Sequence, residues 1–291
     1  MIKKQMKARR FIAAGVMTAF MFVGIASVNA QSISDGLIAY WPFDGDLQDA
    51  VGDSHGEAMG SDDIAYDSGK FGQGIDLDGV DQFVQTPVEN EEMFDFQDGT
   101  GFSISAWFTV DSFSKNWQAL IAKGEGNRWR VHRRGGESIM TGNGGNADVP
   151  AGGTDVTDGE IHHLVLVSDP DGDEVRLYID GELESTGGSP SIQSNDNPMM
   201  IGENPDARNR TWHGMIDDVG IWDRPITEEE IALIYNGGDG TPPVSQGLGI
   251  SIPYVSKLRA GPGGFGFKVA DEPTVGVDVD SVVVSVDGSD V

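Results

Sequence analysis

Short apolar segments separated by turn-forming residues dominate the chain from residue 36 onward. They are rich in β-branched and aromatic residues, and they recur at the spacing of a two-sheet β-sandwich. The pattern therefore predicts an all-β protein. The ten predicted strands are residues 37–43, 74–79, 82–88, 102–110, 119–124, 128–134, 162–169, 174–180, 197–203 and 215–222.

The segment FSISAWFTV at residues 102–110 shows alternation most clearly. Its apolar positions from Phe102 to Val110 fall two residues apart, and Ser103, Ser105 and Trp107 occupy the positions between them. Because successive side chains of a strand point to opposite faces, the segment predicts one core face and one wetter face.

One amphipathic helix is predicted directly after the last strand. Thr227 and Glu230 have the spacing of a capping box, in which each side chain accepts from the other residue's amide. Ile231, Ile234 and Tyr235 then share one face, and the Asn-Gly-Gly at residues 236–238 would end the helix. The helix is short enough to act as a lid and not as a layer.

The acidic stretch DPDGDE at residues 169–174 has aspartates at the first, third and fifth positions of an EF-hand loop. It carries Glu174 where the loop needs glycine, and no helices flank it. Asp, Pro and Gly also form turns in their own right, so we interpret the stretch as a hairpin turn.

Residues 1–30 have the composition of a Sec-type signal peptide. Five basic residues precede an apolar run, and small residues lead up to Ala30. We expect cleavage after Ala30 and export of the remaining chain. An uncleaved N-terminal anchor is the alternative, because the apolar run is long for a signal peptide.

The chain has 47 acidic and 19 basic residues, a formal net charge of −28, and no cysteine. Loss of the signal peptide would take the charge to about −33. Such a protein repels nucleic acid and anionic membranes, so we expect no nucleic-acid partner and no membrane insertion after cleavage. An exported protein without disulfides relies on its core and on metal ions, and its carboxylates favour calcium.

The C-terminal part of the chain differs from the rest. Residues 239–246 are rich in Gly and Pro and are interpreted as a linker. Residues 247–291 show strand patterns again, but they are too few to bury a core of their own. We expect the start of a second, truncated β domain, or the first piece of a longer multidomain protein.

Five segments within residues 36–238 occur in an order typical of one family. They are residues 36–58, 69–84, 102–110, 160–183 and 214–238. In these segments the chain resembles the laminin-G-like, concanavalin A-like jelly-roll domains of bacterial exported proteins. The resemblance implies two antiparallel sheets for residues 31–238, with the first and last strands adjacent. It is far less specific for function.

The resemblance also implies a structural Ca²⁺ near the ends of the domain. By position, Asp217 or Asp218 in MIDDVGIW would supply a late carboxylate, with Asp217 favoured, and Asp44 and the Asp78-Gly79 turn would supply early ligands. A carboxylate inside a strand pattern is costly unless it is paired or metal-bound, which agrees with this assignment. In the alternative, one aspartate faces water and the other accepts backbone amides or pairs with Arg224.

The chain lacks the motifs of the glycan-cleaving enzymes and hydrolases that we considered. No closely spaced strand of alternating acids, Asp box, G-x-S-x-G or HExxH is present. The two glutamates in GELEST, residues 181–186, belong to a predicted hairpin. His162 and His163 are adjacent and would face opposite ways on a strand. We therefore expect no catalysis by this chain.

Basic residues are scarce but concentrate in RWRVHRR at residues 128–134. In a strand, Arg128, Arg130, His132 and Arg134 would line one face as a positive stripe. Such a stripe could bind an anionic glycan through arginine forks on carboxylate or sulfate, with Trp107, Trp117 or Trp129 as a stacking platform. In the alternative, the arginines neutralise neighbouring acids and the tryptophans fill the sandwich.

These features together predict a non-catalytic, calcium-stabilised, exported carbohydrate-binding or adhesion module, secreted or at the cell surface. Two other functions stay open. The chain could be a structural spacer of a larger cell-surface protein, or an accessory domain of a glycan-active enzyme whose catalytic domain lies elsewhere.

Overall fold

The computed structural model describes residues 33–97, 99–145, 147–150 and 152–244, together with the strand segments 254–261, 264–270, 285–286 and 289–290. The predicted signal peptide, part of the linker and most of the predicted second β domain lie outside the described residues. Cleavage after Ala30 and the domain boundaries therefore stay predictions. Within the described part, no helix is long and apolar enough to cross a membrane.

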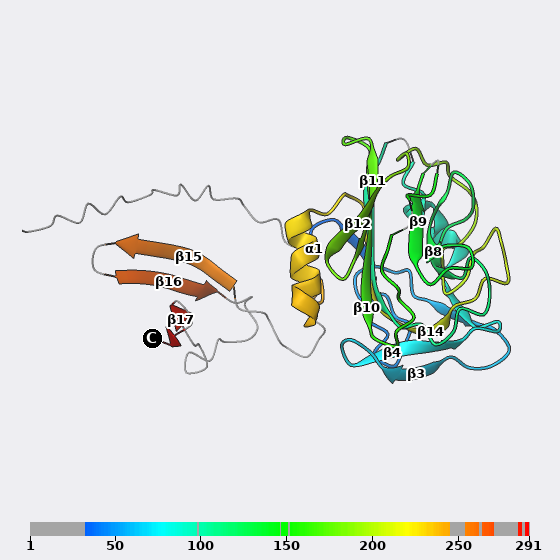
Figure 1. Cartoon of the computed structure of the whole chain (residues 1–291), viewed down its shortest axis with the longest axis horizontal. Coiled ribbons are helices and arrows are strands. Elements are labelled where there is room, and N and C mark those ends of the chain that lie inside the picture. Colours follow the sequence, from blue (N-terminus) through cyan, green and yellow to red (C-terminus); the bar gives the residue numbers. More distant parts are fainter. Residues whose placement is uncertain are drawn as a thin grey trace, which may run out of the picture. The chain divides into compact units, whose positions relative to one another are not determined.

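The first of two large antiparallel sheets, sheet A, has eight strands in the described residues (Figure 1). Its order is β12-β11-β10-β6-β14-β4-β3. β1 lies outside this order: β4 pairs with the first half of β14, and β1 pairs with the second half. The strands are β1 (Leu37–Trp41), β3 (Ala65–Ser68), β4 (Gln73–Asp78), β6 (Phe102–Phe108), β10 (His162–Asp169), β11 (Glu174–Ile179), β12 (Glu182–Gly187) and β14 (His213–Trp222).

The second sheet, sheet B, has six strands in the order β2-β5-β13-β7-β8-β9. Its strands are β2 (Glu57–Met59), β5 (Phe83–Gln85), β7 (Ala119–Ala122), β8 (Trp129–Arg133), β9 (Met140–Gly144) and β13 (Met200–Ile201). Each of the ten predicted segments overlaps one of the fourteen strands in the two sheets. The predicted all-β, two-sheet jelly-roll sandwich is confirmed.

The first and last strands of the sandwich lie side by side, as the resemblance implies. β1 pairs antiparallel with the second half of β14, with Leu37 opposite Trp222 and Trp41 opposite Val219. The segment before β1 is also held to β14, because the Trp222 indole donates to the carbonyl of Ile33 at 2.8 Å. The two ends of the domain therefore meet within sheet A, where β1 pairs with β14.

The core lies between the sheets and is built from the alternating apolar positions of both. Trp41, Trp129 and Trp212 are fully buried there. Each large aromatic removes much apolar surface from water, which provides stability to a chain without disulfides.

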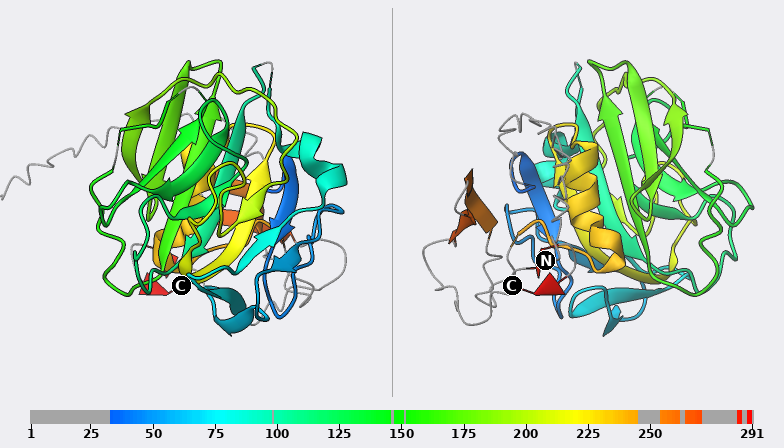
Figure 2. Two further views of the ribbon diagram at one scale, coloured as in Figure 1. Left: turned by 90° about the vertical axis from the view of Figure 1, so that its right-hand side faces the viewer. Right: turned by 60° about the vertical axis from the view of Figure 1, so that its left-hand side comes forward.

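Helix α1 (Glu228–Tyr235) covers the outer face of sheet A (Figures 1 and 2). Its predicted capping box is present, since Thr227 accepts from the amide of Glu230 and Glu230 accepts from the amide of Thr227. The helix ends at Asn236 in the left-handed conformation. Ile231 and Ile234 are buried against β1 and β10, so the helix seals a second, smaller apolar cluster.

This helix changes the environment of β6. The face with Ser103, Ser105 and Trp107, predicted to be wetter, is buried as completely as the core face. Trp107 stacks on Tyr235 of α1 at 5.9 Å between ring centroids, and the Ser103 hydroxyl donates to the carbonyl of Arg224. The prediction of a wet face is wrong, because a segment more than 120 residues away in the sequence covers it.

The remaining regular elements are one hairpin turn, two short 3₁₀ helices and two strand pairs that belong to neither large sheet. Residues 169–174 form the turn of the β10–β11 hairpin, as predicted, with Asp169 opposite Glu174. Two 3₁₀ helices, η1 (Val88–Phe94) and η2 (Asn236–Gly238), complete residues 33–244. Beyond them, β15 (Tyr254–Gly261) pairs with β16 (Gly264–Ala270), and β17 (Ser285–Val286) pairs with β18 (Ser289–Asp290).

Candidate functional site

Strand β8 places the basic residues on the outer face of sheet B. Trp129 and Val131 point into the core and are fully buried, so Arg130 and His132 point to the opposite face. The strand and the shared face predicted for this region agree with the structure. Arg128 precedes the strand and contacts Gln193 at 3.4 Å.

Three basic side chains of this face converge on Asp148. Its carboxylate lies 2.8 Å from Arg130 Nη2, 3.6 Å from His132 Nε2 and 3.9 Å from Arg134 Nη1. Burial raises the pKa of Asp148, but the facing His132 and the charges of Arg130 and Arg134 outweigh it and hold the pKa below its usual value. Asp148 comes from a loop without periodic pattern, and nothing in the sequence indicated it.

Several donors of the β8 face have no hydrogen-bond partner in the described residues. They are Nε and Nη1 of Arg130 and Nε of Arg128, and all three atoms are buried. His132 Nε2 is also buried without a hydrogen bond, but it is an acceptor in the neutral ring, because His132 Nδ1 donates to the Arg133 carbonyl. Arg130 Nε lies 3.8 Å from Glu125 and His132 Nε2 lies 3.6 Å from Asp148, both beyond hydrogen-bond length. Because an unsatisfied buried donor costs free energy, an acceptor oxygen that reached these atoms would be stabilised, which requires a covering side chain to move aside.

Trp117 lies at the edge of this cluster and is half-buried. Its ring centroid is 5.5 Å from that of His132, and the Arg134 guanidinium lies 5.9 Å from the ring. The residue adopts a left-handed backbone, with φ of 60°. An aromatic face beside charged donors suits a sugar ring, whose C–H groups pack on the indole while its oxygens accept hydrogen bonds.

The other two tryptophans predicted as stacking platforms are elsewhere. Trp107 is 2% exposed and lies on sheet A beneath α1, so its assignment to a ligand site is wrong. Trp129 belongs to β8 but is fully buried in the core, where its indole donates to the carbonyl of Phe94 at 2.6 Å.

Within the described part of residues 33–244, the basic residues other than Arg128, Arg130, His132 and Arg134 contact groups of the domain. The Lys123 ammonium is buried 2.6 Å from Glu91 and 3.1 Å from Asp95. Arg133 donates to four backbone carbonyls. Of the others in the described residues, Arg176 and His163 each have one buried nitrogen without a hydrogen bond. The others with side-chain contacts are Lys70, Lys115, Arg208, Arg210 and Arg224.

A second candidate site lies at Asp217 and Asp218, in the middle of β14. The strand changes partner there, from β4 at Ile216 to β1 at Val219. The register with β6 shifts at the same point, and Asp218 has a left-handed backbone with φ of 48°, which forms a β-bulge. Both aspartates are buried, because neighbouring segments close over this point.

The turn at residues 69–73 is held by carboxylates from both ends of the domain. Asp217 accepts from the amides of Lys70 and Phe71 at 2.6 and 3.2 Å, and Asp44 accepts from the amide of Gln73 at 2.8 Å. Gly72 must be glycine, because a Cβ would collide with Asp44 and its φ is 62°. The structure therefore brings Asp44 and Asp217 to one turn.

Asp218 has an oxygen with no partner. Its Oδ1 accepts from the Tyr40 hydroxyl, whereas its buried Oδ2 has no hydrogen bond in the described residues. Burial raises the pKa of Asp217 to about 7, and burial together with the charge of Asp217 raises that of Asp218. Arg224 does not compensate them, since it pairs with Glu230 at 2.6 Å.

These oxygens suit a hard cation. A calcium ion would neutralise the two adjacent carboxylates and satisfy the free oxygen of Asp218. Among the described residues, no three Asp, Glu or His side chains form a group that could hold a metal. Calcium would therefore need backbone carbonyls or water beside the aspartates, as it commonly does.

Asp78 and Gly79 do not belong to this site. Asp78 is opposite His213, at the other end of the β14–β4 ladder, so its backbone lies about 13 Å along the strand from that of Asp217. The two residues form the turn after β4, where Asp78 accepts from the amide of Val80 and the Gly79 carbonyl accepts from Thr211. Their predicted role as ligands of the same ion is wrong, because antiparallel β4 runs away from the aspartate pair.

The adjacent histidines have structural surroundings. His163 Nε2 lies 2.8 Å from the Ser105 hydroxyl, but both residues are buried beneath α1, and burial lowers the pKa of His163 to about 3. His162 points the opposite way, as predicted, and lies 2.8 Å from Asp180 and 3.1 Å from Asp158. The serine–histidine pair is closed to substrate and gives no support to catalysis.

His162 should make the stability of the domain pH-dependent. Its hydrogen bond to Asp180 and the charge of Asp158 raise its pKa above 6.5. A raised pKa in the folded state contributes stability that is present below the unfolded value and is lost as pH rises through the folded value. We expect His162→Gln to lower the unfolding free energy more at about pH 5 than at about pH 8. Urea unfolding at the two pH values measures this.

His55→Gln provides the control for that experiment, because His55 Nδ1 accepts from the amide of Asp49. A loss from His162→Gln that does not change with pH would contradict the assignment of the ion pairs.

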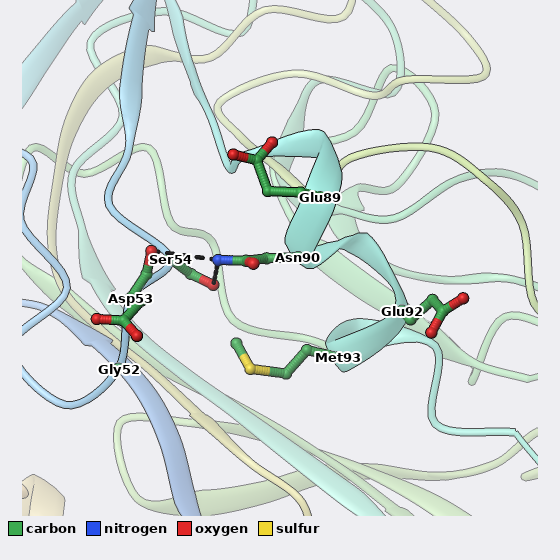
Figure 3. Close-up of a pocket in the computed structure, with 7 residues that line it drawn as sticks. All are labelled: Gly52, Asp53, Ser54, Glu89, Asn90, Glu92 and Met93. Carbon is green, nitrogen blue, oxygen red and sulfur yellow. Dashed lines mark hydrogen bonds between the residues drawn. The ribbon is translucent and has the colours of Figure 1, made fainter.

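A groove of about 390 Å³ lies on the surface between residues 52–54 and η1 (Figure 3). Asn90 bridges its walls by donating to the Asp53 carbonyl and the Ser54 hydroxyl. The lining includes the acids Asp53, Glu89 and Glu92. This acidic lining is unsuited to an anionic ligand, and none of the predicted ligand residues contributes to it.

Comparison with solved structures finds the same fold at low identity. Domain 4 of AbnA, a GH43 extracellular arabinanase from Geobacillus stearothermophilus in complex with arabinotriose, is 18% identical, with a TM-score of 0.53 over 70% of this chain and 98% of that chain. The binding domain of botulinum neurotoxin DC in complex with SialylT is 14% identical, with a TM-score of 0.53 over 70% and 52%. A Trypanosoma rangeli sialidase in complex with 2,3-difluorosialic acid is 15% identical, with a TM-score of 0.52 over 70% and 33%.

At these identities the likeness concerns the fold alone. This chain spans about half the length of the neurotoxin domain and a third of the sialidase. A search of curated proteins finds no match. The family model of the concanavalin A-like lectin/glucanases superfamily matches residues 78–232, more than half of the chain. This protein therefore belongs to the concanavalin A-like lectin/glucanase superfamily.

Proposed function

We propose that this chain is a non-catalytic, exported carbohydrate-binding or adhesion module whose glycan binds along β8 on the outer face of sheet B. The observation that carries the proposal is the set of buried donors without partners on Arg128 and Arg130, together with the half-buried ring of Trp117 beside His132. Donors held in place by a strand lose little entropy on binding, so they favour a ligand rich in oxygen acceptors.

The comparisons support a carbohydrate as the ligand class. Three solved structures of this fold were obtained with arabinotriose, SialylT and 2,3-difluorosialic acid. The arabinotriose complex is of one domain of an extracellular enzyme, and the present chain covers 98% of that domain. An accessory role beside a catalytic domain outside this chain is consistent with that arrangement.

The charge of the site favours an anionic glycan. Arg130 lies on β8, and Arg128 and Arg134 flank the strand, in a protein that is otherwise very acidic. A guanidinium forms paired hydrogen bonds with carboxylate or sulfate oxygens, and such charge-assisted bonds are stronger than neutral ones. Local positive potential also offsets the repulsion that an anion meets on approach.

Calcium at Asp217 and Asp218 completes the proposal. The ion would hold the bulge of β14 to the turn at residues 69–73, which contacts both ends of the domain. Its role is structural, because the β8 site lies on the other sheet.

A structural spacer is the second candidate. The pairing of Arg130 with Asp148 at 2.8 Å favours it, because this arginine then neutralises an acid of its own domain. A spacer would bind no ligand on this face.

A glycan array probed with the purified chain tests the two functions. We expect retention on uronic-acid-containing or sulfated glycans in the presence of calcium, and no hydrolysis of the bound glycan. Trp117→Ala should abolish retention without unfolding the chain, because the ring lies at the edge of the sandwich. Absence of retention on every glycan, with the chain folded, would favour the spacer.

A further inference from the structure

The carboxylate of Asp148 occupies the position that an anionic ligand group would take. It is the only described acid within ion-pair distance of Arg130, His132 and Arg134 together. It satisfies only one arm of Arg130, since Nε and Nη1 remain without hydrogen bonds. The basic cluster therefore binds one carboxylate of its own chain, and two buried Arg130 donors are left without an acceptor.

Backbone hydrogen bonds to β9 hold the loop at Asp148 in place, whereas the Asp148 side chain is partly exposed to solvent. Asp148 forms a β-bridge with Asn143, and the next residue, Val149, is fully buried and donates its amide to the Gly142 carbonyl at 2.8 Å. The Asp148 side chain itself is 18% exposed. Rotation about its χ1 bond moves the carboxylate away from Arg130 without moving the loop.

We propose that Asp148 is an internal competitor for the β8 site, so that binding of an anionic glycan exchanges its carboxylate for a carboxylate or sulfate of the ligand. This inference rests on the proposed function and specifies how that site is regulated. Two anions next to each other repel, so the ligand gains the arginine contacts only by displacing Asp148. A neutral sugar causes no such repulsion and would instead use Asp148 as an acceptor for its hydroxyl groups.

Binding of an anionic ligand and binding of a neutral sugar require opposite roles of the Asp148 side chain. If Asp148 competes, Asp148→Asn removes the competing charge while the amide oxygen still accepts from Arg130. Affinity for anions should then increase. If Asp148 serves as an acceptor for neutral sugars, the same substitution should weaken binding.

The test uses thermal unfolding and calorimetry of the full chain with sodium sulfate and sodium glucuronate as probes. Sodium chloride at matched ionic strength and glucose are the references. We expect Asp148→Asn to bind sulfate and glucuronate at least tenfold more tightly than the unsubstituted chain, with no gain for glucose. Arg130→Gln added to Asp148→Asn should remove the gain.

Asp62→Asn is the matched control. It makes the same change in charge at an exposed position just after β2, the strand at the edge of sheet B opposite the β8–β9 edge. Its affinities should equal those of the unsubstituted chain. An equal gain from Asp62→Asn would show a general effect of net charge and overturn the inference.

The outcomes separate this inference from the proposed function. Tighter anion binding by Asp148→Asn together with a blank glycan array would support the internal competitor and remove the carbohydrate function. Glycan retention on the array with weaker or unchanged anion binding by Asp148→Asn would keep the function and overturn the competitor. Failure of both would leave Asp148 as a structural counter-ion.

Discussion

Calcium is expected to raise the midpoint of thermal unfolding by about 5–10 °C relative to EDTA. An ion at a hundredfold excess over its dissociation constant adds about 2.7 kcal/mol to the folded state, and each kcal/mol shifts the midpoint of a domain this size by about 2–4 °C. The gain arises because the ion neutralises two buried adjacent carboxylates and satisfies the free oxygen of Asp218. Differential scanning calorimetry of the chain in calcium and in EDTA measures it.

Two substitutions locate the ion. Asp218→Asn should abolish the calcium shift, because it removes one charge and the buried carboxylate oxygen. Asp78→Asn should retain it, since Asp78 lies at the far end of the β14–β4 ladder and keeps its contact with the amide of Val80. A full calcium shift in Asp218→Asn, or identical midpoints in calcium and EDTA for the unsubstituted chain, would remove the calcium site.

The calcium effect should also depend on pH. Burial raises the pKa of Asp217 from 3.8 to about 7, so in EDTA the folded chain binds more protons than the unfolded chain between these values. The unfolding free energy in EDTA should therefore fall as pH rises from about 4 to about 7. Calcium replaces the proton as the compensating charge, so its stabilisation should be larger at the higher pH. A calcium shift that grows toward acid pH would contradict this sign.

Arg130→Ala is expected to weaken glycan binding by at least tenfold, the second large effect. Arg130 is 8% exposed and has two buried donors without partners. Loss of a charge-assisted hydrogen bond costs about 1.5–3 kcal/mol, and every 1.4 kcal/mol corresponds to a factor of ten in affinity. Arg130→Lys should recover only part of the binding, because an ammonium cannot form the planar pair of hydrogen bonds. Calorimetric titration with a glycan identified on the array gives the affinities.

Arg176→Ala serves as the matched control, since Arg176 pairs with Asp169 and Glu174 on sheet A, away from β8. It removes one positive charge and should leave glycan affinity unchanged. Equal losses from Arg130→Ala and Arg176→Ala would reduce the β8 site to an effect of overall charge. Unfolding midpoints of both variants are needed, because removal of Arg130 leaves the buried carboxylate of Asp148 with fewer partners.

Much of the fold could be predicted from local patterns. The period-two alternation of residues 102–110 and 128–134 identified β6 and β8, and Thr227 with Glu230 marked the start of α1. These signals are readable because each element sets its own periodicity and its own caps. The short strands β2, β3 and β9 lack a clear pattern and were not predicted, since pairing with neighbours and not composition makes them strands. β12 was predicted only as part of a hairpin.

The candidate sites could be predicted only in part. The basic face of β8 follows from alternation within one strand, so Arg130 and His132 were correctly grouped with Arg134. Asp148 was not predicted, because its loop reaches β8 through pairing with β9. Trp107 was misassigned, because α1 covers a strand whose sequence cannot show what packs on it.

The sequence by itself determined the strand segments, the capped helix, the basic face of one strand and, by resemblance, the adjacency of the first and last strands. Tertiary structure alone decided that Asp44 and Asp217 share a turn, that Asp78 is excluded from it, and that Asp148 neutralises the basic face. Alternation and caps depend on neighbouring residues, whereas a shared site depends on which distant segments the sheets bring together.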